Sequence, residues 1–202
     1  ANPIDLSVDS IALGNHLEAL ALLEKRISEA LDGVDAEASL APLAMGGEGN
    51  VYTRFLAPRL ERLFSAVKLG AWDEATQDSA NCAGCGMGLT PSSDDLLCGY
   101  FTTLHLLYRA NGNTSAKAHI QHMAQAAASK TNRISASFLL QSGMALANEA
   151  VCDLFRSIDL EFDTCSADRA IARVLAIGST SGADTLTGVT LALRKHIGGN
   201  EV

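Results

Sequence analysis

The chain has 202 residues, of which 48% are hydrophobic but only 5% aromatic, and its formal net charge is −8. This composition favours packed helices over a β-sandwich, and the length is sufficient for one buried core. The negative charge without a cluster of Lys or Arg argues against nucleic acid or an anionic membrane surface as partners, and no apolar run reaches the roughly 18–20 residues of a membrane span.

Hydrophobic spacing predicts a mostly α-helical chain. A helix over 10–31 ends at Asp32-Gly33, and residues 33–51 read as a loop. Weak strand candidates are limited to 51–53 and 174–177. The further helices are expected over about 52–69, 72–79, 93–110, 115–129, 134–156, 167–176 and 183–197, with a first Gly-rich loop over 80–93.

We interpret residues 1–202 as a single helical domain. Residues 1–79 form its N-terminal helices, and residues 80–202 form a core that carries two loop motifs. The N-terminus has no features of a signal peptide, and five cysteines are an odd number, so we expect a reduced, cytoplasmic protein.

One sequence pattern occurs twice, at 88–99 and 178–188. Each copy is a loop rich in Gly and hydroxyl residues that leads into an apolar helix with a carboxylate in its first turn. With one deletion at Pro91, the first copy's Ser92, Asp95, Leu97 and Gly99 align with Ser181, Asp184, Leu186 and Gly188. Because a helix start points free N–H groups at whatever lies before it, the pattern predicts a site built on an internal pseudo-repeat.

Helix capping offers a purely structural alternative. Ser92 with Asp95, and Ser181 with Asp184, have the spacing of a capping box, in which the serine and the acid satisfy the first N–H groups of a helix.

Capping does not account for the glycines. Gly84, Gly86 and Gly88 alternate before the first helix, which indicates positive φ angles or a close approach to a ligand. Gly99 and Gly188 each follow the aspartate by four residues, on the same helical face. We expect the two helices to cross closely at these glycines and to bring their N-termini together.

A third segment, Lys130-Thr131-Asn132-Arg133, begins another predicted helix. Cations at a helix N-terminus oppose the macrodipole, so Lys130 and Arg133 suit a docked anion. The alternative is a solvated lysine and an arginine paired with Asp94 or another acid.

These motifs together resemble a known family. The chain resembles a bacterial family that includes the AllH-type subunit of oxamate carbamoyltransferase. The resemblance is carried by three motifs in the family's order, at residues 84–95, 131–135 and 178–188. The family's N-terminal β-rich region is not recognised here, so the resemblance is to its helical C-terminal part. The chain departs from the family pattern at four positions, Met87, Ser93, Leu96 and Ser179.

The resemblance implies a subunit of a carbamoyl-transferring enzyme that binds a small anionic metabolite. Asp95 and Asp184 are the expected catalytic residues, since they would orient an amine or polarise a donor. The expected substrate-binding residues supply backbone N–H groups, hydroxyls or positive charge: Gly86, Gly88, Thr90, Ser92, Ser93, Lys130, Arg133, Ser181 and Gly182.

Two alternatives stay open. In the first, the chain is a Mg²⁺-dependent hydrolase whose metal is held by Asp94, Asp95 and Asp184; otherwise no cofactor or metal is expected. In the second, it is a non-catalytic scaffold that docks other enzyme subunits, with loops that serve only as caps. The expected partners are other subunits or further copies of this chain.

Overall fold

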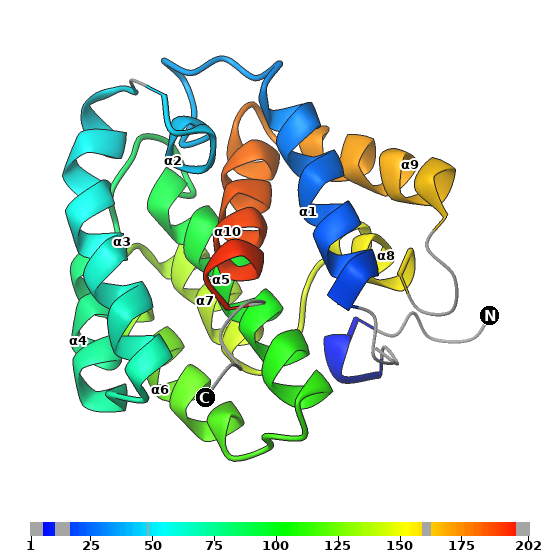
Figure 1. The fold of residues 1–202 in the computed structure, drawn as a ribbon. Helices are drawn as coiled ribbons and strands as arrows, with labels where there is room; N and C mark the ends of the chain where they lie inside the picture. Colours follow the sequence, from blue (N-terminus) through cyan, green and yellow to red (C-terminus); the bar gives the residue numbers. More distant parts are fainter. Residues whose placement is uncertain (1–5, 11–16, 48, 159–162, 197–202) are drawn as a thin grey trace.

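The computed structural model describes residues 6–10, 17–47, 49–158 and 163–196. Within these ranges the chain forms ten α-helices, one 3-10 helix and no strand, which confirms the predicted all-α class (Figure 1). The helices are η1 (Val8–Ser10), α1 (Leu17–Leu31), α2 (Pro42–Met45), α3 (Val51–Leu69), α4 (Trp72–Cys82), α5 (Ser92–Ala110), α6 (Ala116–Ala128), α7 (Arg133–Gly143), α8 (Glu149–Arg156), α9 (Thr164–Leu175) and α10 (Ser181–His196). None of the described helices has the length and apolar character needed to cross a membrane.

Several predicted boundaries are wrong. The weak strand candidate at 51–53 is the first turn of α3, because the Asn50 side chain caps it by accepting from the N–H groups of Tyr52 and Thr53. The other candidate, 174–177, lies at the end of α9 and the turn after it. Helix α4 runs to Cys82, so the first Gly-rich loop begins later than expected. Residues 11–16 and 197, part of two predicted helices, lie outside the described residues.

The helix expected over 134–156 is two helices. It breaks after Gly143, where Ala145 has a φ of 63°, and restarts at α8 with Asn148 as its N-cap. The intervening segment pairs with the N-terminal residues: the Val8 N–H donates to the Ala145 carbonyl at 2.9 Å, and the Ala147 N–H to the Leu6 carbonyl at 3.0 Å.

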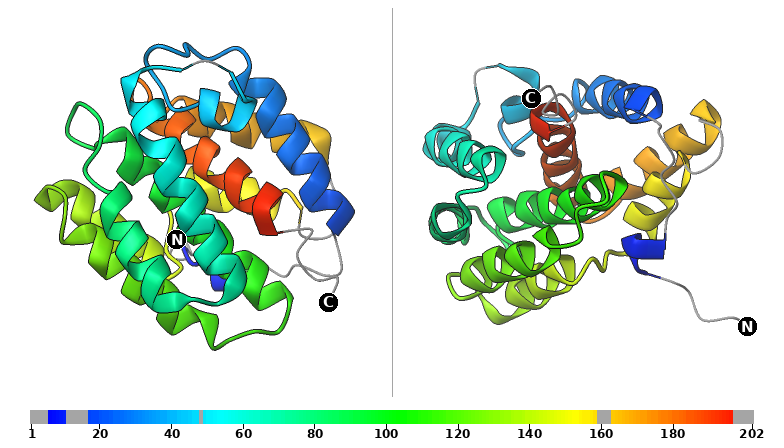
Figure 2. Two further views of the ribbon diagram at one scale, coloured as in Figure 1. Left: turned by 60° about the vertical axis from the view of Figure 1, so that its left-hand side comes forward. Right: turned by 60° about the horizontal axis from the view of Figure 1, so that its bottom comes forward.

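Helices α5 and α10 pack against each other at the centre of the molecule (Figure 2). A Cβ atom added at Gly99 would lie 2.1 Å from the Thr185 carbonyl oxygen, and one at Gly188 would lie 1.9 Å from that of Leu96. Only glycine permits such a separation between backbones. The predicted close crossing is therefore confirmed.

Two hydrophobic clusters flank this central pair. One unites α1, α8 and α9 with the Leu186 side of α10, and the other unites α3, α4, α6 and α7 with the Leu97 side of α5. Figure 2 shows the same division, with α1, α8 and α9 on one side of α5 and α10 and with α3 and α4 on the other. The central pair therefore has a fixed position, and the residues at its two N-termini are held by packing on both sides.

Candidate functional site

The loop before α5 is shaped by its glycines. Gly84, Gly86 and Gly88 have φ angles of 76°, 131° and 96°, which confirms the expected positive φ. A Cβ at Gly86 would lie 2.4 Å from the backbone nitrogen of Ser92, whereas Gly88 has open space around it. The loop thus folds back tightly on the first turn of α5.

The capping-box interpretation is wrong for both loops. The N-cap of α5 is Pro91, which makes no side-chain cap, and Ser92 is already inside the helix. The Ser93 hydroxyl instead accepts from the Cys85 N–H at 2.8 Å. In the second copy, Ser181 is the first residue of α10 and its hydroxyl contacts that of Thr90. Asp184, in the first turn, accepts from the N–H of Leu40, which lies outside α10, at 2.7 Å.

The two loops meet at Thr90 and Ser181. Their hydroxyl oxygens are 3.1 Å apart, so the N-termini of α5 and α10 converge as predicted. The serine of each copy lies near the aspartate of the other: the Ser181 hydroxyl lowers the pKa of Asp95, and the Ser92 hydroxyl lowers the pKa of Asp184. The interpretation of the two segments as a repeat stays a prediction.

Asp95 lies beside this junction. Burial raises its pKa to about 7, the hydroxyls of Ser181 and Thr90 oppose the shift, and the charges of Asp184 and Asp94 add to it. Its Oδ2 is buried and accepts no hydrogen bond from the residues described. A carboxyl group with this pKa can exchange a proton near neutral pH.

Asp184 is completely buried behind the junction. Burial raises its pKa to about 6, against the bond from the Leu40 N–H and the hydroxyls of Ser92 and Thr180. Its Oδ2 has no hydrogen-bond partner within the described part of the chain.

Asp94 holds the loop and α7 in place. It is fully buried, and its carboxylate accepts from the Gly84 N–H and the Ser135 hydroxyl, each at 2.7 Å, and from the Thr131 hydroxyl. Its oxygens are therefore engaged by protein donors. Among the described residues, no three His, Cys, Asp or Glu side chains group as a metal site would require.

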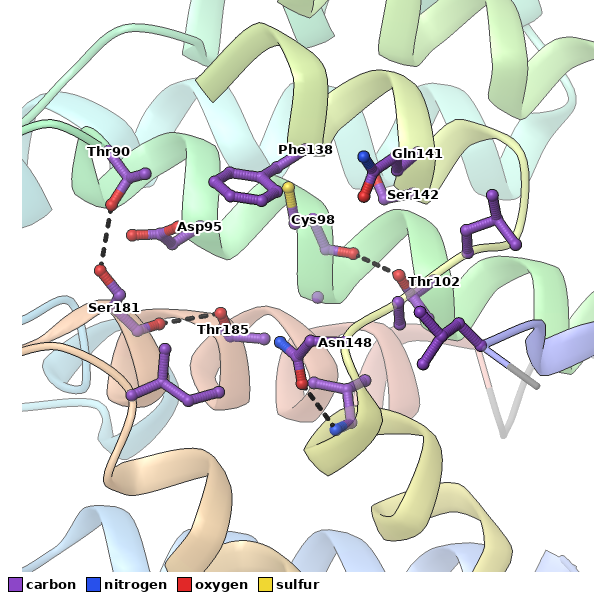
Figure 3. Close-up of a pocket in the computed structure, with 16 residues that line it drawn as sticks. Thr90, Asp95, Cys98, Thr102, Phe138, Gln141, Ser142, Asn148, Ser181 and Thr185 are labelled. Atoms are coloured by element: carbon purple, nitrogen blue, oxygen red, sulfur yellow. Dashed lines mark hydrogen bonds between the residues drawn. The ribbon is translucent and has the colours of Figure 1, made fainter. Parts of the chain in front are cut away.

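A cavity of about 340 Å³ opens next to Asp95, between α5, α7, α8 and α10 (Figure 3). Its polar lining is Thr90, Asp95, Cys98, Thr102, Gln141, Ser142, Asn148, Ser181 and Thr185. Its remaining lining is Leu6, Gly99, Phe138, Leu146, Ala147, Val151 and Ile177. Neither set contains a Lys, Arg or His, so the lining carries one titratable acid, one thiol and neutral donors and acceptors.

Only three of the predicted site residues line this cavity: Thr90, Asp95 and Ser181. Lys130 and Arg133 are exposed at the start of α7. Between them in the sequence, the Asn132 side-chain NH₂ donates to the Leu89 carbonyl of the first loop at 2.9 Å. The Gly182 N–H donates to the Ile177 carbonyl, and a Cβ there would lie 1.9 Å from the Val174 carbonyl oxygen. Gly182 therefore permits close packing between α9 and α10, and its N–H group is occupied.

The residues on the α7–α8 side of the cavity were not among the site residues predicted from the sequence. Gln141, Ser142 and Asn148 reach the cavity because the chain breaks between α7 and α8. The available signal was Asn148 followed by Glu149, since asparagine is a favoured N-cap and an acid suits the first turn of a helix.

Comparison with known proteins gives one family. Residues 82–193 match the family model described as oxamate carbamoyltransferase subunit AllH, which covers more than half of the chain. No match was found among curated proteins or among solved structures. The matched segment includes both loops, α5, α7, α8 and α10, and so most of the cavity lining.

Proposed function

The chain belongs to the family of the oxamate carbamoyltransferase subunit AllH, and we propose that it acts as a subunit of a carbamoyl-transferring enzyme whose amide acceptor binds beside Asp95. The observation that supports this most strongly is the Asp95 carboxyl group itself. It faces a cavity large enough for a small metabolite, and burial raises its pKa to about 7.

Transfer of a carbamoyl group to an amide requires a proton acceptor. The amide nitrogen attacks the carbonyl carbon of the carbamoyl donor, a C–N bond forms, and the bond from that carbon to the donor's leaving oxygen breaks. The nitrogen must lose one proton, and under this proposal the Asp95 carboxylate takes it. An acid with a pKa near the working pH is suited to such a proton transfer.

Thr90 and Ser181 would position the acceptor and tune Asp95. Both hydroxyls lie at the cavity wall and lower the pKa of Asp95, which keeps a usable fraction of it ionised at neutral pH. Asp184 does not line the cavity; it acts through its charge, which helps to raise the pKa of Asp95.

Both an anionic donor such as carbamoyl phosphate and the carboxylate of an acceptor such as oxamate would need positive groups from outside the described cavity lining. Lys130 and Arg133 stay candidates, because they are exposed at the start of α7, where Asn132 donates to the Leu89 carbonyl on the loop that carries Thr90. Other subunits of the enzyme are the second source of such groups.

The test is the carbamoyl-transfer activity of the tagged chain isolated together with the subunits that co-purify with it. The acceptor is oxamate and the donor is carbamoyl phosphate. We expect Asp95→Asn to lower the rate by about 10²–10⁴-fold, as for loss of a general base. Asp153→Asn, at a partly exposed position of α8 outside the cavity lining, is the control and should retain the rate. Full activity of Asp95→Asn, or no transfer by the wild-type assembly, would contradict the proposal.

A further inference from the structure

We infer that the surface bordering the cavity between the first loop and α7 docks another subunit of the enzyme, and that this subunit presents apolar and acidic side chains to it. The inference rests on the proposed function, because it identifies the face of this chain that such a partner covers. We call this face the rim surface, and it consists of Met87 and Leu89 on the loop, Ile134 and Phe138 on α7, and the cations Lys130 and Arg133.

The rim surface exposes large apolar side chains from two segments that are in contact. Met87 and Leu89 are 78% and 75% exposed, although the loop that carries them folds tightly onto α5. Ile134 and Phe138 lie one turn apart on α7 and are also exposed. The Asn132 side chain joins the two segments by donating to the Leu89 carbonyl at 2.9 Å. Single exposed apolar residues are common, but a group gathered from two elements is typical of a protein interface.

This surface adjoins the cavity. The Phe138 side chain belongs to both, since it lines the cavity as well (Figure 3). Leu89 directly precedes Thr90, another lining residue. A subunit that covers the rim surface therefore also reaches the edge of the cavity that holds Asp95, where it can exclude water and contribute side chains to the site.

The charges on the rim surface indicate the chemistry of the partner. Lys130 and Arg133 are exposed, and neither forms an ion pair within the described part of the chain. Both lie at the start of α7, where positive charge opposes the helix macrodipole. Acidic side chains on the partner would offset this repulsion. With the two cations engaged in this way, the positive groups that the anionic substrates need come from the partner itself.

The test uses the tagged full chain together with the subunits that co-purify with it. Leu89→Glu places a negative charge on the rim surface, and we expect it to lower the recovery of the other subunits by about tenfold or more. Leu69→Glu is the matched control, because Leu69 is 82% exposed at the end of α3 and lies outside the rim surface. It should leave the recovery unchanged, and both isolated variants should melt at the wild-type temperature.

Reversal of the two cations tests the charge of the partner. The double variant Lys130→Glu, Arg133→Glu should not destabilise the isolated chain, since acids suit a helix N-terminus, and yet it should weaken the assembly. If the cations bind the donor instead, the assembly stays intact and the KM for carbamoyl phosphate rises. That result would overturn the acidic character assigned to the partner.

Hydrogen exchange gives a direct readout of the contact. Exchange of the backbone amides of residues 87–89 should slow when the chain enters the assembly, and unchanged exchange there would overturn the inference. Full recovery of the other subunits by Leu89→Glu, or no recovery by the wild type, would do the same. So would a dimer of the purified chain that Leu89→Glu dissociates, because the rim surface would then bind a second copy.

The inference and the proposed function can fail separately. If the wild-type assembly transfers carbamoyl groups and Leu89→Glu keeps all its subunits, the inference fails and the proposed function stands. If Leu89→Glu loses the other subunits but the wild-type assembly transfers no carbamoyl group, the docking surface stands and the proposed function fails.

Discussion

The hydroxyl oxygens of Thr90 and Ser181 lie 3.1 Å apart, although the two residues are 91 positions apart in the sequence. This contact joins the loops before α5 and α10 at the wall of the cavity, beside Asp95. It also connects the two halves of the pattern that the sequence shows twice. The contact therefore places two neutral hydroxyls beside a carboxyl group whose pKa is raised by burial.

Removal of the Thr90 hydroxyl should make Asp95 less acidic. The hydroxyl lowers the pKa of Asp95, so Thr90→Val should raise that pKa above its value of about 7. A ¹³C NMR titration of the carboxyl resonance measures the change. Thr114→Val, at an exposed site outside this cavity, should leave the Asp95 titration where it is. A lower or unchanged pKa in Thr90→Val would contradict the described coupling.

The close crossing of α5 and α10 should not tolerate a methyl group. In Gly188→Ala the new Cβ would meet the Leu96 carbonyl oxygen, a backbone atom that cannot rotate away. We expect a loss of about 3 kcal/mol in the free energy of unfolding, or a fall of about 6–12 °C in Tm. Gly47→Ala, where nothing lies within 4 Å, is the matched control and should have little effect. Equal stability of the two variants would show that the crossing is looser than described.

Asp94 should matter for stability rather than for chemistry. Asp94→Ala removes the acceptor of the Gly84 N–H and of the Thr131 and Ser135 hydroxyls. Buried donors without partners cost about 1–3 kcal/mol each, so we expect a loss of about 3–5 kcal/mol in urea unfolding. Asp153→Ala breaks only partly exposed ion pairs, with Arg156 and Arg173, and should cost about 1 kcal/mol or less. A small effect of Asp94→Ala would contradict its role in holding the loop to α7.

Asp184 should make the folded chain less stable as the pH rises. Its pKa is about 6 in the folded chain and about 3.9 when unfolded, so the folded chain binds more protons between these values. Stability from this group is therefore complete below about pH 4 and lost by about pH 6. We expect the stability of Asp184→Asn relative to the wild type to rise by on the order of 2–3 kcal/mol from pH 4 to pH 6 and to level above that. Urea unfolding at intervals of pH measures this, and a constant difference would argue against the raised pKa.

The sequence was sufficient for the central pair of helices. Glycine is unfavourable inside a helix, so Gly99 and Gly188 indicated a close crossing of the two helices. The separations between the two backbones confirm it. The Ser-x-x-Asp spacing was misleading, because it fits a capping box equally well. Tertiary packing decides whether the Ser92 hydroxyl caps its own helix or lies near Asp184, and local spacing does not encode that packing.

The α7–α8 side of the cavity lay beyond sequence reasoning for a specific reason. Residues 134–156 have continuous helical periodicity, and the break after Gly143 depends on contacts from distant segments. A Cβ at Gly143 would lie 2.5 Å from the Ala124 side chain, and the residues after it pair with Leu6 and Val8. Without that break, Asn148 would not cap α8 at the cavity, so a continuous helix gave no reason to place this residue near Asp95.

The most direct test is the pH dependence of kcat/KM for carbamoyl transfer to oxamate by the assembled enzyme. If Asp95 is the proton acceptor, the wild-type value rises with pH through an apparent pKa near 7 and then levels, because the carboxyl group must be ionised to act. In Asp95→Asn the rate should be about 10²–10⁴-fold lower and this inflection should be absent. An Asp95→Asn enzyme that keeps both the rate and the inflection would contradict the account.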